Sequence, residues 1–342
     1  MLNRSNRNPD KTEVAMNKAL VLEQEDKKTL AAVRELTPDE LPEGDVLVSI
    51  EYSSLNYKDG LAVTGIGKIV HQFPMVPGVD FAGRVAESSN PAYQVGDSVV
   101  LTGWSVGERY WGGYAQQMRV KSEWLVPLAE GLTSQQAMVI GTAGLTSMLC
   151  VMRLQESGLK PEDGPVLVTG ATGGVGSLAV ALLAKNGYEV VAVSGKADSH
   201  DYLKQLGAKE VLSRAEFEEK ARPLDKSRWA GAVDTVGGDV LAKVLSQMHY
   251  NGRVAAVGLA GSAMLNTTVM PFILRGVDLL GVDSVMIPYE RRVQAWQRIA
   301  KELPQEIMTQ VVEEVSLEQV PEHAKNIIEG KVRGRVLVNP NL

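Results

Sequence analysis

The sequence contains one cysteine and four histidines in 342 residues. A single cysteine excludes an intramolecular disulfide and any cysteine-rich zinc site. Cys150 stands in the apolar run SMLCVM, so we expect it to be a buried small hydrophobic residue. No histidine is paired with another His or Cys at the spacing of metal ligands. The sequence therefore predicts no metal. The four histidines are His71, His200, His249 and His323.

The chain also lacks an apolar run of 18 residues and an excess of basic residues. Without such a run we expect no membrane span. Its 41 acidic residues outnumber its 35 lysines and arginines, which gives a net charge of -6 and argues against a general nucleic-acid binder. Residues 1–15, MLNRSNRNPDKTEVA, lack the apolar core of a signal peptide. We expect them to form a disordered leader and the protein to be cytoplasmic, with no nucleic-acid or membrane partner.

From Lys18 to about Val126 the chain is rich in short strand-like runs. VLVSIEYSSL and SVVLTGW are two of these runs, and glycine- and proline-containing turns separate them. Strands that follow one another without amphipathic helices predict a partly antiparallel β-barrel. The pattern changes around Thr133, where SQQAMVIGTAGLTSMLCVMRL predicts one or two helices broken by Gly141 and Gly144.

Strands and helices alternate after this helical stretch. The predicted strands are PVLVTG, EVVAVS, VLS, AVDTVGG, GRVAAVG and DLLGVDSV, and predicted helices separate several of them. Such alternation predicts right-handed βαβ units and an α/β fold with a doubly wound, six-stranded parallel sheet of the Rossmann type. We place this domain at residues 136–287, and the barrel domain at residues 16–135 and 288–342.

The stretch VTGATGGVGS, residues 168–177, predicts a dinucleotide-binding turn. Its glycines follow an apolar strand and open a helix, which is the context that a dinucleotide fingerprint requires. The helix N-terminus offers free N–H groups and a positive dipole end to a pyrophosphate. The expected pyrophosphate-binding residues are Gly173, Gly174, Val175, Gly176 and Ser177.

No acidic residue ends the second predicted strand, where NAD-binding folds usually hold the ribose 2′-hydroxyl with Asp or Glu. The strand ends Ser194-Gly195-Lys196, and Arg214 follows the third strand. A hydroxyl and cationic groups at this place favour a 2′-phosphate, so we predict that the cofactor is NADPH. The alternative is that Lys196 and Arg214 are ordinary solvated surface residues.

Several stretches together resemble the medium-chain dehydrogenase/reductase superfamily. They are SSLNYKD, FPMVPGVDFAGRV, VGDSVV, GGYAQ and TGATGGVG. The resemblance covers the chain from Met16 and implies that the barrel is a GroES-like catalytic domain. Longer stretches, among them LTGWSVGERYWGG, WAGAVDTVGG and ERRVQAWQR, resemble the acrylyl-CoA reductase group of its quinone-oxidoreductase branch.

The resemblance also bears on zinc. Zinc-dependent members of the superfamily read Gly-His-Glu where this chain reads Gly78-Val79-Asp80, and a cysteine ligand is expected near Asn56. Without a Lewis acid, the hydride acceptor must be activated in its own right, as an enone, a quinone or an α,β-unsaturated thioester is. The resemblance implies NADPH-dependent reduction of acrylyl-CoA to propionyl-CoA. A quinone or enone reductase and a non-catalytic NADPH-binding protein are the alternatives.

The segment SSLNYKD supplies the candidate catalytic residues, Asn56 and Tyr57. In related reductases it lines the nicotinamide pocket, so the two side chains could position the nicotinamide or polarise the carbonyl of the acceptor. The alternative is that Asn56 and Asp59 cap a turn and Tyr57 belongs partly to the core. The resemblance further implies cofactor contacts from Tyr57, Thr142, Gly258, Leu259, Ser284 and Arg335.

Two further expectations concern binding partners. Trp104, Tyr110 and Trp111 lie near Arg109 in one loop and could hold coenzyme A, although the favoured explanation is local packing of the loop. The apolar sixth strand, DLLGVDSV, ends the parallel sheet and predicts a homodimer in which it pairs with its twin. Alternatively, the C-terminal helices cover that edge.

Overall fold

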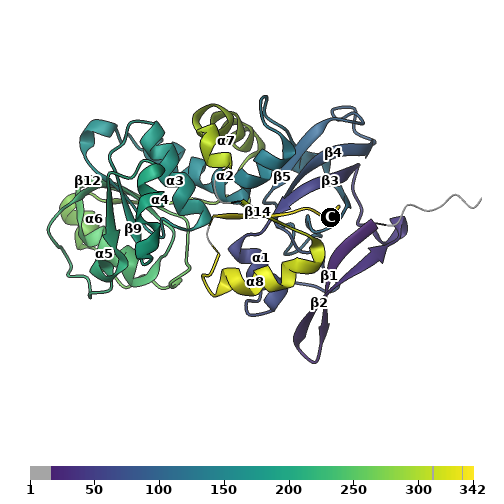
Figure 1. Ribbon diagram of the computed structural model, residues 1–342. Coiled ribbons are helices and arrows are strands. Elements are labelled where there is room, and N and C mark those ends of the chain that lie inside the picture. Colours follow the sequence, from purple (N-terminus) through teal and green to yellow (C-terminus); the bar gives the residue numbers. More distant parts are fainter. Residues whose placement is uncertain (1–16, 310–311, 333) are drawn as a thin grey trace, which may run out of the picture.

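The computed structural model describes residues 17–309, 312–332 and 334–342, so the expected leader lies outside the described residues. Two sheets lie side by side, and the long helix α2 (Ser134–Glu156) runs between them (Figure 1). The helix contacts strands of both sheets. It therefore links the two halves of the chain.

The first sheet is the expected six-stranded parallel sheet. Its order is β10-β9-β8-β11-β12-β13, and every neighbouring pair is parallel. This is the 3-2-1-4-5-6 order of dinucleotide-binding folds, so the predicted fold class is confirmed. The strands are β8 (Val166–Val168), β9 (Val190–Ser194), β10 (Glu210–Ser213), β11 (Trp229–Asp234), β12 (Met248–Ala256) and β13 (Asp278–Gly281).

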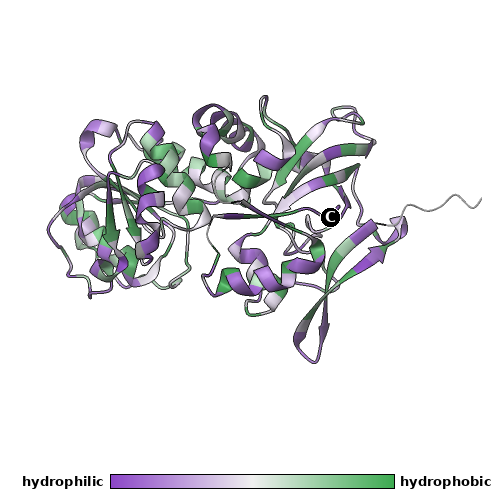
Figure 2. Cartoon of the chain, in the orientation of Figure 1, coloured by the Kyte–Doolittle hydropathy of each residue, from purple (hydrophilic) through white to green (hydrophobic). Residues whose placement is uncertain are grey.

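The central strands of this sheet are buried on both faces. Every residue of β8, β9 and β11 is buried, as expected for parallel strands covered by helices on both sides. Figure 2 shows these hydrophobic strands inside a layer of helices whose outer surfaces are hydrophilic. The helices that alternate with the strands are α3 (Gly174–Lys185), α4 (His200–Gln205), α5 (Gly238–Ser246) and α6 (Met270–Arg275).

The second sheet is mixed, in agreement with the expected partly antiparallel domain. Its order is β14-β15-β3-β4-β5-β7, with β6 paired to β3, and only the β14–β15 pair is parallel. A hairpin, β1 (Asn17–Glu25) and β2 (Lys28–Leu36), lies beside it. The sheet strands are β3 (Val46–Ser54), β4 (Asp80–Ser88), β5 (Ser98–Thr102), β6 (Gln117–Val120), β7 (Val126–Pro127), β14 (Val312–Val315) and β15 (Arg335–Val338).

Three helices accompany the second sheet, and one of them was not predicted. Helix α1 (Tyr57–Thr64) interrupts the stretch that was expected to hold strands alone, and it packs against α8 (Val320–Ile328) (Figure 1). Its start is capped, because the backbone N–H of Asn56 donates to the Asp59 carboxylate at 2.9 Å. Helix α7 (Tyr289–Glu302) packs on α2.

Helix α2 differs from the prediction at one of its two glycines. Gly141, with φ of 53° and ψ of -158°, breaks the helix as expected, whereas the chain stays helical through Gly144. By length and composition α2 could cross a membrane, but 89% of its apolar window is buried inside the fold, which makes it a core helix. Cys150 lies in it with 0% exposure, as predicted, and burial raises the pKa of its thiol.

Candidate active site

The glycine-rich turn joins β8 to α3 at the carboxyl end of the parallel sheet. Gly170 has a φ of 58°, and a Cβ at Gly176 would lie 2.3 Å from the carbonyl oxygen of Gly170. Both positions therefore require glycine. Gly173 is the N-cap of α3, and the first N–H groups of the helix, at Gly174 and Val175, have no partner within it. The turn thus presents free N–H groups and the positive end of a helix dipole.

Arg335 reaches this turn from β15. A Cβ on Gly174 would lie 3.0 Å from Nη1 of Arg335. The Nε atom of Arg335 donates to the Val139 carbonyl at 2.9 Å and Nη2 donates to Oγ of Ser54 at 2.8 Å, which leaves Nη1 beside the turn. We expected Arg335 to reach back toward the cofactor or the substrate, and the structure places its Nη1 beside the glycine-rich turn. Ser177, in the first turn of α3, is buried, and its hydroxyl donates to the Gly174 carbonyl at 3.3 Å.

The ends of β9 and β10 lie together, as neighbouring parallel strands must. The backbone N–H of Lys196 donates to the Ser194 hydroxyl at 2.9 Å, which turns the chain after β9. The Arg214 guanidinium lies over this turn, since a Cβ on Gly195 would be 3.4 Å from its Cζ. The Lys196 ammonium donates to the Gly330 carbonyl at 2.7 Å, in the turn after α8. Lysine and arginine therefore flank the place where an NAD-binding fold carries an acid.

Asp80 is the centre of a buried hydrogen-bond network below the kink in α2. Its side chain is fully buried and accepts from the Ser54 hydroxyl at 2.8 Å, the Thr142 backbone N–H at 2.8 Å and the Asn56 amide at 3.0 Å. Because Ser54 also accepts from Arg335, the buried carboxylate and the buried guanidinium are linked through one hydroxyl. The kink at Gly141 is what exposes the Thr142 N–H to the carboxylate.

Asp59 is a second buried carboxyl group in this region. It accepts from the backbone N–H groups of Asn56 at 2.9 Å and Val79 at 3.0 Å. Burial, and secondly the charge of Asp80, raise the pKa of Asp59 to about 7. The Tyr114 hydroxyl donates to the Ser54 carbonyl at 3.2 Å, and burial raises its pKa well above the ordinary value. Asp59, Asp80, Ser54 and Tyr114 thus form a buried polar cluster beside Asn56.

The two candidate catalytic residues differ in what their polar groups contact. The Asn56 amide nitrogen has two hydrogens, and its neighbours are Asp80 Oδ2 at 3.0 Å, Ser54 Oγ at 3.2 Å and Ser54 O at 3.3 Å. Both amide hydrogens of Asn56 are thus used in hydrogen bonds to Asp80 and Ser54. Tyr57, the first residue of α1, is 43% exposed. Of the two, Tyr57 is the side chain that offers an accessible donor.

The remaining expected cofactor residues lie at three different places. The Thr142 hydroxyl is buried and has no hydrogen-bond partner among the described residues. Gly258 packs on the loop after β11, because a Cβ there would be 2.0 Å from the Thr235 carbonyl oxygen. Leu259 is 66% exposed, and the Ser284 carbonyl accepts from Arg292 at 3.4 Å. Gly258 and Ser284 follow β12 and β13, so they lie at the carboxyl edge of the sheet with the glycine-rich turn.

Each aromatic residue of the loop after β5 has a packing or hydrogen-bond partner other than Arg109. Trp104 stacks under the guanidinium of Arg292, with 4.9 Å between the Arg292 Cζ and the ring centre. Trp111 donates to the Pro74 carbonyl at 3.1 Å, and Tyr110 packs on Trp124 with 4.8 Å between ring centres. Local packing, the alternative stated above, describes these residues.

The donor set around Val79 does not suit a metal ion. Val79 has no donor atom, the Asn56 amide faces Asp80, and the Arg335 cation lies one hydroxyl away. In the described parts of the chain, no three His, Cys, Asp or Glu side chains gather as ligands.

Sequence reasoning missed Ser54 and Arg292 as parts of this region, and it named Asp59 only as a residue that caps a turn with Asn56, which the structure shows at the start of α1. The Asn-x-x-Asp spacing at 56–59 is a capping signal that could have indicated helix α1. No local signal could have found Arg292, whose partner Thr102 lies 190 positions away.

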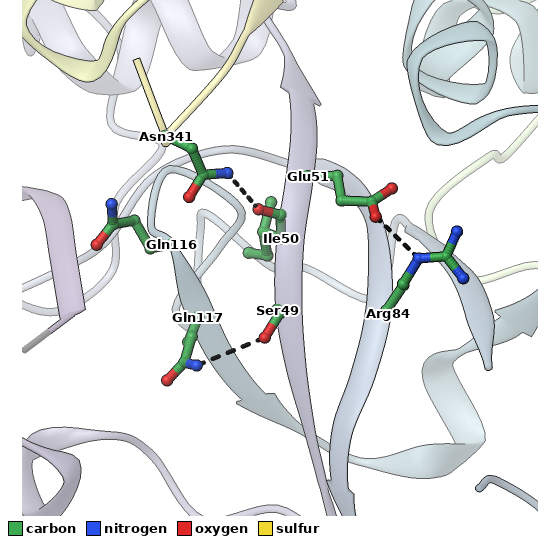
Figure 3. A pocket seen from close by; sticks show the side chains of 7 residues that line it. All are labelled: Ser49, Ile50, Glu51, Arg84, Gln116, Gln117 and Asn341. Carbon is green, nitrogen blue, oxygen red and sulfur yellow. Dashed lines mark hydrogen bonds and ion pairs between the residues drawn. The ribbon is translucent and has the colours of Figure 1, made fainter. Parts of the chain in front are cut away.

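A separate surface pocket of about 330 Å³ lies on the second sheet (Figure 3). Two polar interactions lie along its walls: Glu51 pairs with Arg84 at 3.0 Å, and Asn341 donates to the Ile50 carbonyl at 3.0 Å. None of the residues expected to bind cofactor or substrate lines it. It is lined by Ser49, Ile50, Glu51, Arg84, Gln116, Gln117 and Asn341.

Two family models match the chain. An alcohol dehydrogenase GroES-like domain matches residues 42–130, and a zinc-binding dehydrogenase domain matches residues 174–301. The first covers much of the second sheet, and the second covers the region from α3 to α7. The two halves seen in the structure thus correspond to two different domain families.

The chain is also similar to complete proteins. It is 60% identical to the probable acrylyl-CoA reductase AcuI of Escherichia coli (strain K12) over 94% of this chain and 99% of that protein. It is 53% identical to the acrylyl-CoA reductase AcuI of Ruegeria pomeroyi, over 95% and 100%. A crystal structure of E. coli K-12 YhdH with bound NADPH superposes with a TM-score of 0.93 at 60% identity, covering 94% of this chain and 100% of that chain.

Proposed function

Because this chain belongs to the medium-chain dehydrogenase/reductase superfamily, in the quinone-oxidoreductase branch with the acrylyl-CoA reductases, we propose that it reduces acrylyl-CoA to propionyl-CoA with NADPH. The observation that carries the proposal is the identity of 60% and 53% to two acrylyl-CoA reductases over nearly the whole chain. The predicted resemblance is confirmed at this level.

The residues of the dinucleotide site fit NADPH. The N–H groups at the start of α3 and Nη1 of Arg335, which lies beside Gly174, are suited to the pyrophosphate. The Ser194 hydroxyl, the Lys196 ammonium and the Arg214 guanidinium suit a 2′-phosphate. The buried, unpartnered Thr142 hydroxyl is suited to a polar group of the cofactor. The solved relative with bound NADPH supports the same assignment.

Bound NADPH would supply a hydride to the β-carbon of the acrylyl group. The protein then has to stabilise the negative charge that builds on the thioester oxygen and admit a proton to the α-carbon. We infer that the Tyr57 phenol donates to this oxygen, since it is accessible, and that Asn56 fixes the entry to α1 through Asp80 and Asp59.

The reaction needs no metal in this proposal. An α,β-unsaturated thioester is already electrophilic at its β-carbon, so hydrogen-bond donors suffice to stabilise the enolate. The side chains that stand where the sequences of zinc-dependent members carry ligands support this. Val79 cannot bind a metal, and the Asn56 amide donates a hydrogen bond to the Asp80 carboxylate.

We further propose the domain division stated above, with residues 136–287 as the nucleotide domain and residues 16–135 and 288–342 as the catalytic domain. The protein would work in the cytoplasm as a homodimer. Strand β13 supports the dimer, because it is an edge of the parallel sheet and Leu279 on it is 37% exposed.

Stopped-flow measurement of NADPH oxidation tests the proposal. Acrylyl-CoA, crotonyl-CoA and a benzoquinone are each mixed with enzyme and NADPH, and the series is repeated with NADH. We expect the highest kcat/KM with acrylyl-CoA and NADPH. Turnover of the quinone without turnover of acrylyl-CoA would instead establish a quinone reductase, and NADPH binding without any turnover would establish a non-catalytic protein.

A further inference from the structure

The backbone just after β5 is strained. Gly103, Trp104 and Ser105 have φ values of 81°, 56° and 60°, so three consecutive residues adopt the left-handed conformation. This conformation is unfavourable for residues that carry a Cβ. Such strain persists only where the surroundings hold it, and it is found most often at functional sites. The contacts that hold this loop are therefore of interest.

Arg292, on α7, is the main side chain that holds the loop. It is 0% exposed, and its Nη1 donates to the Thr102 carbonyl at 2.6 Å and to the Thr102 hydroxyl at 3.2 Å. Its Nη2 donates to the Val285 carbonyl at 3.0 Å. The face of the guanidinium lies on the Trp104 ring, at 4.9 Å from the ring centre. Arg292 therefore contacts both Thr102, at the end of β5, and Trp104, inside the strained loop.

The partners of Arg292 are neutral acceptors. Among the described residues it takes part in no ion pair with a carboxylate, and burial lowers its pKa to about 10, which still leaves it protonated at pH 7. Its function is thus geometric, because a planar fork of five donors bonds to several carbonyls at once. A lysine ammonium cannot match this arrangement or stack on the indole.

The two segments that Arg292 joins belong to different halves of the site. Thr102 pairs with Asp80 across the β4–β5 ladder, and the Gly103 N–H donates to the Val79 carbonyl at 3.3 Å. Val285 follows β13 at the carboxyl edge of the parallel sheet, where dinucleotides bind. The segments touch directly: the Trp104 N–H donates to the Val285 carbonyl at 2.9 Å. Figure 1 shows α7 above α2, between the two sheets.

We propose that Arg292 is a positioning residue for hydride transfer, which holds the 102–105 loop of the catalytic half in register with the 284–285 turn of the nucleotide half. This inference rests on the proposed function, because it assumes that the acceptor lies beside the first segment and the nicotinamide beside the second. A change in register would alter the separation of the reacting carbons. A misplacement of about 1 Å costs on the order of 100-fold in rate.

The test is a single-turnover experiment on purified Arg292→Lys, which keeps the charge and loses the fork. Enzyme loaded with NADPH is mixed with saturating acrylyl-CoA, and NADPH absorbance is followed. The amplitude reports the fraction of sites that are folded and bind NADPH, and the rate constant reports the chemistry in those sites. We expect the rate constant to fall about 100-fold, with an unchanged amplitude and an unchanged NADPH Kd.

Arg291→Lys is the matched control, because Arg291 is the neighbouring residue on α7 and forms a surface ion pair with Glu156. We expect it to behave as the wild type. We also expect ethylguanidinium to restore part of the rate constant of Arg292→Ala. Reduced amplitude with the wild-type rate constant in Arg292→Lys would overturn the proposal, since it would mean a purely structural role. An equal fall in Arg291→Lys would overturn it as well.

A second pair of variants decides the matter if Arg292 variants do not fold. Trp104→Leu removes the ring under the guanidinium and should lower the rate constant, whereas Trp104→Phe keeps a ring and should not, because the buried indole N–H has no partner among the described residues. Equal rate constants in these two variants would contradict the proposal.

The failure of the proposed function can be told apart from failure of this inference. If wild-type enzyme oxidises NADPH with benzoquinone and not with acrylyl-CoA, the proposed function falls and the same variants are compared with the quinone. Wild-type enzyme that reduces neither acceptor would contradict both.

Discussion

The side-chain amide of Asn56 donates to Oδ2 of Asp80 at 3.0 Å. The Thr142 N–H and the Ser54 hydroxyl donate to the same carboxylate at 2.8 Å each. Neutral donors thus surround the Asp80 carboxylate, and Ser54 links it to the Arg335 guanidinium. Catalysis that relies on hydrogen bonds, with a self-activated acceptor, agrees with this arrangement.

Tyr57→Phe should lower kcat with acrylyl-CoA by about 100-fold, the size of effect seen when one donor to an oxyanion is removed. The thermal midpoint should change little, because the residue is 43% exposed. Steady-state kinetics and a thermal melt check this. Tyr250→Phe is the control, since Tyr250 is 74% exposed and lies at the start of β12. A kcat equal to that of the wild type would remove Tyr57 from the catalytic residues.

Lys196→Ala should lower kcat/KM for NADPH by about 10- to 100-fold, because a hydrogen bond to a charged group contributes about 1.5–3 kcal/mol. The value for NADH should stay the same, since NADH has no 2′-phosphate. Lys209→Ala serves as control, because Lys209 forms an exposed ion pair with Glu189 elsewhere on the same domain. If both cofactors lose the same factor, Lys196 acts through its bond to Gly330 rather than through the phosphate.

The raised pKa of Asp59 predicts that the protein loses stability as the pH rises from 3.8 toward 7. Its folded-state pKa of about 7 lies above its ordinary value of 3.8, so between these values the folded protein binds more protons at this site than the unfolded chain. The stability that the group contributes is complete below pH 3.8 and falls as pH rises toward 7, by at most about 1.4 kcal/mol per pH unit.

Urea unfolding of wild type and Asp59→Asn at pH 5, 6, 7 and 8 measures this. From pH 5 to 7 the free energy of unfolding of the wild type should fall relative to that of Asp59→Asn, and the difference should become constant by pH 8. A difference that is constant from pH 5 to 7 would show that the Asp59 pKa is not raised.

The dimer predicts that a charge on the edge strand blocks association. Light scattering of the wild type should give twice the chain mass of 36.9 kDa over a range of concentrations. Leu279→Lys, on β13, should give the chain mass, because like charges would face each other across the twofold axis. Ile66→Lys, at a residue that is 69% exposed on the other half, should remain dimeric. A wild type that is monomeric at every concentration would contradict the prediction.

Much of the fold follows from local patterns. Continuous apolar strands that alternate with helices predict a parallel sheet, and β8, β9 and β11 are buried throughout as that pattern requires. Local patterns predict the structure less well where the same residue type can either break a helix or lie inside it. Gly141 breaks α2, whereas the chain stays helical through Gly144. Either glycine permits a kink. The kink occurs at Gly141, where the Asp80 carboxylate accepts a hydrogen bond from the Thr142 N–H.

The sequence by itself determined the nucleotide site, because the glycines of residues 170–176 and the residues after β9 act through neighbours in the chain and need only a strand before them and a helix after them. Only the tertiary structure decided the rest of the candidate active site. Asp80, Thr142 and Arg335 lie far apart in the sequence, and packing α2 between the two sheets is what brings their polar groups together. The engagement of Asn56, the exposure of Tyr57 and the fork of Arg292 all depend on that packing.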